Sequence, residues 1–222
     1  NDPRPENMPI LEDLYNLLRE QEEKEAQYIA TALEIYVTGS LNVFNHQSNV
    51  DINNRIVCYD IKELGKQLKK IGMLVVQDQV WNRVIRNKAN GRRTWLYVDE
   101  FHRFFSNQYA AAQFKDIYKR ARKYGLGVTG ITQNVEEILD LQDAREMLSN
   151  SDFLMLLSQN STDADALCEL LTLSEEQRQY FTGVLPGQGL MKIGSAYVPF
   201  DGRIPAGGDL YRLYSTTFQE GK

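Results

Sequence analysis

Two adjacent carboxylates follow a short apolar run in the middle of the chain. The run from Trp95 to Val98 is followed directly by Asp99 and Glu100. Such a run predicts a buried strand, and ligands of open α/β sheets bind at the carboxyl ends of the strands. There, one acid can hold Mg²⁺, commonly through water, while the other orients or deprotonates the water that attacks a nucleoside triphosphate. The alternative is a polar strand end that caps the next helix.

A neutral amide follows the next apolar run. Residues 127–132 predict a strand, and Gln133 comes directly after it. Because parallel strands end at the same edge of a sheet, we expect Gln133 to lie beside the two acids. Strand-end amides of this kind sense the γ-phosphate in many nucleotide motors. The alternative is a helix cap that binds no ligand.

A basic segment precedes that strand. Residues 119–125 place four cations at the predicted end of a helix. Arg122, or else Arg120, could contact a nucleotide held by a neighbouring subunit, as an arginine finger does. The helix dipole also favours cations at a helix C-terminus, which is the structural alternative for each of them.

The composition is that of a globular protein, with 222 residues of which 42% are hydrophobic and 25% charged. It excludes collagen-like, low-complexity and disulfide-scaffold proteins, and no apolar run is long enough to span a bilayer. Cys58 and Cys168 lack metal-ligand spacing, which favours a reduced, cytosolic compartment and argues against zinc. Residues 61–124 carry 15 basic and 5 acidic side chains. That excess suits either a polyanionic partner or a solvated helix surface.

The sequence pattern changes near residue 50. Residues 1–50 predict an all-α subdomain with two amphipathic helices and a polar joint, and residues 51–222 predict an α/β core. Alternating apolar runs and amphipathic stretches are typical of a mostly parallel sheet flanked by helices. A β-hairpin is expected over 189–200, turning at Gly194-Ser195. The expected strands are 55–60, 94–98, 127–132 and 153–157. Residues 61–89 are expected to form one long helix or two, and the other expected helices of the core are 107–123, 143–149, 161–171 and 174–181.

These motifs, in this order, resemble the C-terminal motor part of the large conjugative (Vir-type) ATPases of type IV secretion systems. The resemblance extends over nearly the whole chain. It implies a RecA-like P-loop NTPase core of the HerA/FtsK superfamily, with the all-α subdomain in residues 1–50. It is carried by Asp99-Glu100-Phe101, by Arg122–Gly125 leading to Thr132-Gln133-Asn134, and by Leu171–Glu176, Leu185–Leu190 and Tyr214–Thr217.

The resemblance implies roles for individual residues. Asp99 would serve Mg²⁺ through water, and Glu100 would be the catalytic carboxylate. Gln133 would sense the γ-phosphate, and Arg122 or Arg120 would act as a finger on the neighbouring subunit.

Three further residues have weaker signals. Gly187 and Gly189 would lie near the nucleotide base or the subunit interface, although an ordinary glycine turn is the simpler explanation. His102 departs from the small-plus-aromatic pair expected after the acids. It is given no chemical role, because a lone histidine is usually a surface or structural residue.

The phosphate-binding loop of this class is absent from the sequence. No G-x-x-x-x-G-K-[ST] occurs, and Gly65-Lys66 is followed by Gln67 within a helical pattern. In the family the loop precedes the helical region, so we expect the loop and the first strand upstream of Asn1, in a longer chain. The alternative is a degenerate relative that does not hydrolyse nucleotide.

The expected function is hydrolysis of ATP, with Mg²⁺, by a motor that powers pilus assembly or substrate transfer. The expected partners are further copies in a ring or hexamer and other type IV secretion components. We expect a cytoplasmic location at the inner face of the cell membrane, through those partners and without insertion. Two alternatives stay open. One is a DNA-translocating pump or coupling protein, which the basic middle section favours slightly, and the other is a non-catalytic scaffold.

Overall fold

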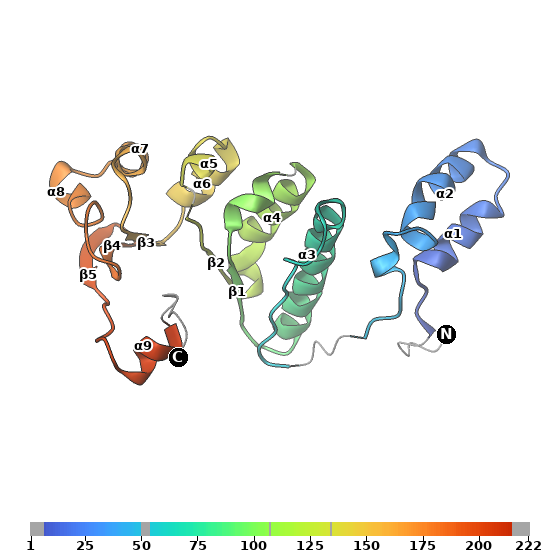
Figure 1. Ribbon diagram of the computed structural model, residues 1–222, viewed down its shortest axis with the longest axis horizontal. Helices are drawn as coiled ribbons and strands as arrows, with labels where there is room; N and C mark the ends of the chain where they lie inside the picture. The colour runs from blue at the N-terminus through green and yellow to red at the C-terminus, as the bar shows by residue number, and fades with distance from the viewer. Residues whose placement is uncertain (1–6, 50–53, 107, 134, 215–222) are drawn as a thin grey trace, which may run out of the picture. The chain divides into compact units, whose positions relative to one another are not determined.

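The computed structural model describes residues 7–49, 54–106, 108–133 and 135–214 (Figure 1). Contacts divide the chain into two compact units, Asn1–Gly72 and Met73–Lys222. No helix among the described residues is long and apolar enough to cross a membrane.

The first unit contains the helices α1 (Leu11–Arg19) and α2 (Lys24–Val37) and the 3₁₀ helix η2 (Asn42–Phe44). The buried side chain of Asn45 joins them. Its Oδ1 accepts from the N–H of Glu12 at 2.8 Å, and its Nδ2 donates to the carbonyl of Val37 at 3.2 Å. One side chain thus satisfies a free N–H at the start of α1 and a free carbonyl at the end of α2. The two helices predicted here are confirmed.

The second unit takes in most of the long helix α3 (Lys66–Ala89), whose first turns belong to the first unit. Strands and helices alternate after it, which confirms the mixed α/β class. The elements that follow α3 are β1 (Thr94–Val98), η3 (Phe101–Ser106), α4 (Gln108–Arg120), η4 (Ala121–Tyr124), β2 (Leu126–Gly130), α5 (Val135–Leu139), α6 (Gln142–Ser149), β3 (Phe153–Leu157), α7 (Ser161–Leu171), α8 (Glu175–Arg178), β4 (Gln188–Ile193), β5 (Ala196–Asp201) and α9 (Asp209–Tyr214).

The strands of the described residues form two sheets (Figure 1). β1 and β2 pair in parallel, with Thr94 opposite Leu126. β3, β4 and β5 form an antiparallel sheet, with Leu156 opposite Leu190. The predicted β4–β5 hairpin is confirmed, and it turns at Gly194, whose φ of +59° is a conformation that glycine adopts without steric cost.

One strand prediction is wrong, and the pairing of another strand was not predicted. Residues 55–60 form bends and irregular chain, and Ile56 is exposed. A strand without a partner leaves its backbone N–H and C=O groups unpaired, so an apolar run alone does not produce one. Residues 153–157 do form a strand, but β3 pairs with β4 of the hairpin and not with β2. A short apolar run indicates a buried strand without naming its neighbour.

Helices cover one face of the parallel pair. A buried cluster that includes Val98 joins β1, η3, α4, α5 and α6, and a second cluster around Val84 joins α3 to α4 and β2. A third cluster, with Phe181 fully buried, packs α5 and α7 on β3 and β4. On the other face of β1, Trp95 and Tyr97 are exposed. The packing fixes the ends of β1 and β2, where the predicted site residues lie.

Candidate functional site

Backbone hydrogen bonds join the segments that follow β1 and β2. The N–H of Ile131 donates to the carbonyl of Val98 at 2.8 Å, and the N–H of Phe101 donates to the carbonyl of Ile131 at 3.0 Å. The ring of Phe101 is buried so close to Gly130 that a Cβ there would come within 2.9 Å of it. The polar residues that follow the two strands are therefore held side by side at the carboxyl edge of the sheet, as predicted.

The two acids stand on a sharp backbone turn. Glu100 has a φ of +50°, a left-handed conformation that costs a residue with a side chain on the order of 1 kcal/mol. The Asp99 carboxylate accepts the N–H of Glu100 at 3.0 Å, and the carbonyl of Glu100 accepts the N–H of Arg103 at 2.9 Å, which begins η3. Asp99 is exposed, and the side chain of Glu100 is 35% exposed.

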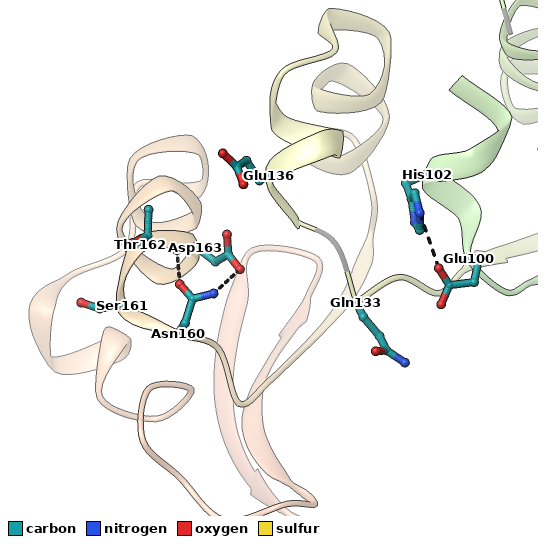
Figure 2. A pocket seen from close by; sticks show the side chains of 8 residues that line it. All are labelled: Glu100, His102, Gln133, Glu136, Asn160, Ser161, Thr162 and Asp163. Carbon is teal, nitrogen blue, oxygen red and sulfur yellow. Dashed lines mark hydrogen bonds and ion pairs between the residues drawn. The ribbon is translucent and has the colours of Figure 1, made fainter. Parts of the chain in front are cut away.

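Glu100 lines a pocket of about 650 Å³ within the second unit. Figure 2 shows Gln133 between the pair formed by Glu100 and His102 and the start of α7. Two of the predicted site residues, Glu100 and Gln133, therefore line one cavity. Its described lining residues come from the segments after β1 and β2 and from the starts of α5 and α7, and they are Glu100, His102, Gln133, Glu136, Asn160, Ser161, Thr162 and Asp163.

The start of α7 forms the wall opposite Glu100 (Figure 2). Asn160 caps this helix: its Oδ1 accepts the N–H of Asp163 at 2.9 Å, and its Nδ2 donates to the Asp163 carboxylate at 2.6 Å. Sequence reasoning predicted the helix but not its place in the pocket. The available signal was the Asn-x-x-Asp spacing of a helix cap, which marks a helix start and does not indicate a ligand.

His102 is a pocket residue that sequence reasoning missed. Its side chain is only 10% exposed. Its Nδ1 lies 3.0 Å from the hydroxyl of Thr132, and its Nε2 lies 3.5 Å from the carboxylate of Glu100 and 3.7 Å from that of Glu137. The ring therefore bridges the segment after β1, the segment after β2 and helix α5.

Gly187 and Gly189 are not among the described residues that line the pocket. Gly187 has a φ of +91° in the turn that leads into β4, where glycine is the favoured residue. A Cβ on Gly189 would collide with the carbonyl oxygen of Leu156, because β3 and β4 approach closely there. Backbone geometry thus accounts for both glycines: Gly187 lies in an ordinary turn, as the simpler explanation expects, whereas Gly189 lies within β4.

The two candidate finger residues lie at the opposite edge of the sheet from the pocket. Arg120 donates to Asp116 at 2.9 Å and to the hydroxyl of Tyr124 at 3.1 Å, and its guanidinium lies over Trp81 at 4.7 Å. Arg122, in η4, is exposed. Both precede β2, whose five residues span about 17 Å and lead to the pocket edge. Neither arginine is therefore placed at the pocket of its own chain.

The pocket wall is acidic. It contains Glu100, Glu136 and Asp163, and none of its described lining residues is Lys or Arg. A nucleoside triphosphate suits such a wall only with a divalent cation and with phosphate-binding groups from elsewhere. No group of three His, Cys, Asp or Glu side chains suited to a metal occurs in the described part of the chain. Magnesium at a nucleotide site, however, commonly takes one or two carboxylates and completes its shell with phosphate and water. The residues present therefore fit the carboxylate side of a nucleotide site, and the sequence has no phosphate-binding loop motif.

The TraG P-loop domain family matches residues 11–188, and the chain belongs to this family. The fold is shared with the solved structure of VirB4 of Thermoanaerobacter pseudethanolicus, at a TM-score of 0.74 and 23% sequence identity. The match covers 92% of this chain and 59% of that chain. No curated protein matches the sequence. The resemblance to the conjugative ATPases, with their P-loop NTPase fold, is thus confirmed at the level of family and fold.

The motifs that carried the resemblance fall at different places in the structure. Asp99–Phe101 and Thr132-Gln133 lie at the carboxyl edge of the parallel strands. Leu171–Glu176 joins α7 to α8. Asn134 and residues 215–217 lie outside the described residues.

Proposed function

We propose that this chain is the motor part of a type IV secretion ATPase that hydrolyses ATP to power pilus assembly or substrate transfer. One observation carries the proposal: Glu100 and Gln133 both line one pocket at the carboxyl ends of the parallel strands. Membership of a P-loop domain family supports a nucleotide as the ligand of that pocket.

The proposal gives each polar residue at the strand ends a separate task. Glu100 orients the attacking water and accepts its proton, Asp99 holds Mg²⁺ through water, and Gln133 contacts the γ-phosphate. When bound, Mg²⁺ supplies the charge that the leaving phosphate needs. The left-handed turn at Glu100 supports this arrangement, because it lies at the strand end, where the side chain of Glu100 lines the same pocket as Gln133.

We propose that two groups supply the positive charge that the described lining residues of the pocket do not provide. One is a phosphate-binding loop upstream of Asn1, and the other is Arg122 of a neighbouring copy in a ring. The position of Arg122 at the far edge of the sheet supports its action on another copy. Other type IV secretion components would hold the ring at the inner face of the cell membrane.

The substitution Asp99→Asn tests the proposal in the protein extended upstream to include a phosphate-binding loop. Asparagine retains the oxygen that accepts the N–H of Glu100 and removes only the charge. We expect the Mg²⁺ concentration for half-maximal ATP hydrolysis to rise roughly ten- to hundredfold, because a water-mediated metal contact is lost.

The matched control is Asp60→Asn, in which the lost charge also belongs to a carboxylate that accepts a nearby backbone N–H, that of Lys62 at 2.8 Å. Its Mg²⁺ dependence should equal that of the wild type. An equal Mg²⁺ requirement in the Asp99 variant would remove the metal role of Asp99. No ATP binding or hydrolysis by the extended wild-type protein would overturn the proposed function and favour a non-catalytic scaffold.

A DNA-translocating pump is the second candidate, and a basic surface at the amino edge of the parallel strands favours it. Residues 79–98 and 117–126 contain nine Lys and Arg residues and no acid. The structure brings the two segments together, because Lys88 lies 4.1 Å from the centre of the Tyr124 ring and the N–H of Thr94 donates to the carbonyl of Gly125 at 3.1 Å. Such a surface suits the phosphate backbone of DNA.

DNA binding measured over a range of salt concentrations separates the two candidates. A pump that holds DNA on this surface should bind more weakly as salt rises, because each phosphate contact releases a counterion. Substituting Arg92 and Arg93 by Ala should reduce that dependence. Absence of DNA binding at low salt would contradict the second candidate and leave the first untouched.

A further inference from the structure

The Nε2 atom of His102 is close to two carboxylates that belong to different elements. This atom faces Glu100, which follows β1, and Glu137, which lies on α5. Carboxylates accept hydrogen bonds and, when ionised, do not donate them, so we assign the proton of the neutral ring to Nε2. Nδ1 then pairs with the hydroxyl of Thr132, which can act as either donor or acceptor.

The imidazole ring is held in this position by its surroundings. Phe101 and Phe105, on either side of His102 in η3, are both buried, and their rings meet edge to face at 5.1 Å. The side chain of His102 is itself almost fully buried. A ring fixed in this way presents its N–H in one direction, toward Glu100 and Glu137 (Figure 2 draws the Glu100 contact).

Among the described residues, the carboxylate of Glu100 has one other ion-pair partner, Arg103. The backbone of Glu100 is in the left-handed region, and the Nε of Arg103 lies 3.8 Å away on a side chain that is 62% exposed. An exposed ion pair of that length fixes a carboxylate weakly. The buried ring of His102 is therefore the more rigid partner of Glu100.

We propose that His102 is a positioning residue that couples Glu100 to the segment bearing Gln133. The inference rests on the proposed function. Thr132 directly precedes Gln133, so a movement of Gln133 toward the γ-phosphate shifts the hydroxyl that holds Nδ1. The ring moves with that hydroxyl and so changes the position of the Glu100 carboxylate. When the Glu100 carboxylate turns toward the attacking water, the carboxylate of Glu137 is a second acceptor for Nε2. His102 thus acts through Glu100 and does not touch the nucleotide.

The test compares His102→Ala with His102→Gln in the extended protein. Glutamine returns an N–H donor close to the position of Nε2, whereas alanine removes it. For alanine we expect kcat to fall roughly ten- to hundredfold with little change in the KM for ATP, because a residue that orients a catalytic group has been lost. Glutamine should recover most of that loss. His46→Ala, at the exposed second histidine of the chain, should leave both constants unchanged.

A second variant keeps the inference testable if His102→Ala does not fold. Thr132→Val removes the hydroxyl that holds Nδ1 and keeps the branched shape of the side chain. It should lower kcat several-fold. The double variant with His102→Gln should lose less kcat than the product of the two single losses, because both substitutions act on the same series of contacts.

The outcomes separate this inference from the proposed function. An active wild type whose kcat is unaffected by His102→Ala, or a glutamine variant no better than the alanine variant, would overturn the positioning role. A loss of melting temperature with kcat intact would likewise mean that His102 is only structural. No ATP hydrolysis by the wild type would overturn the proposed function, and the inference would fall with it.

Discussion

Glu100 carries a left-handed backbone because the chain must turn sharply from β1 into η3. Neighbouring contacts offset the strain, since Phe101 is buried and its N–H is bound to the carbonyl of Ile131. Strain of this kind persists where the surroundings over-determine the conformation, which is common at functional sites. At the scale of single residues, the pocket is therefore set by the backbone that holds Glu100 and by the ring that holds its carboxylate.

The ion pair of Asp201 predicts how the stability of the fold depends on pH. The Arg203 guanidinium, whose Nε lies 2.9 Å from Oδ1, and the Gln188 amide hold the pKa of Asp201 well below its ordinary value. A lowered pKa in the folded state stabilises the fold above the unfolded-state pKa of about 3.9, and this contribution is lost as the pH falls below that value. We expect the melting temperature to drop as the pH is lowered from about 5 to about 3, and less steeply in Asp201→Asn.

Because the side chains of Asp201 and Arg203 are nearly half exposed, the difference between wild type and variant should shrink at high salt. An identical pH dependence in the two proteins would show that this ion pair does not contribute to stability.

The sequence predicted the acid pair and Gln133 because each follows an apolar run, and the end of a strand is visible in such a run. It did not predict the place of His102. The partners of that histidine, Thr132 and Glu137, are 30 or more residues away in the sequence, and no local sequence pattern predicts such a contact. The roles of the site residues stay predictions, while the positions of Glu100 and Gln133 at one pocket agree with the expected sheet edge.

At the scale of elements, the close approach of β3 and β4 makes Gly189 a packing requirement. We expect Gly189→Ala to lower the free energy of unfolding by about 1–3 kcal/mol, because the new methyl collides with the carbonyl of Leu156 in a packed sheet. Gly202→Ala is the control, since a Cβ there would meet the carbonyl of Gly187 at an ordinary 3.5 Å. Chemical denaturation measures both variants, and equal stabilities would contradict the close approach.

The elements themselves were predicted unevenly. β1, β2, β3, α7 and the hairpin follow from apolar periodicity and turn glycines. The short helix α5 was not predicted, because five residues are too few to show a helical period. The run at 55–60 was wrongly predicted as a strand, and the partner of β3 was not predicted, because pairing depends on neighbours that a local pattern does not contain.

At the scale of the whole molecule, the acidic pocket and Arg122 stand at opposite edges of one parallel pair. A single copy cannot bring them together across the length of β2. In the proposed motor, a second copy is therefore needed, and its Arg122 would contact the nucleotide in the pocket of the first. Arg120 is the weaker candidate, because Asp116, Tyr124 and Trp81 already hold its guanidinium.

Mixing two inactive variants of the extended protein tests this requirement. Arg122→Ala should lower kcat by about 10³-fold, the effect of losing an arginine finger. Mixed with an equal amount of Glu100→Gln, it should recover up to about a quarter of the wild-type rate, because some contacts pair an intact pocket with an intact arginine. No recovery on mixing, under conditions where the copies exchange, would contradict action between copies. Arg120→Ala should lower the melting temperature instead.

In the proposed function, Glu100 activates the water that attacks ATP, and Glu100→Gln in the extended protein tests this role. Glutamine preserves the size of the side chain and cannot accept the proton. ATP turnover and ATP affinity would be measured on the same preparation. We expect turnover to fall by about 10²–10⁴-fold, the usual contribution of a general base, while ATP affinity changes little. Turnover equal to that of the wild type would contradict the claim.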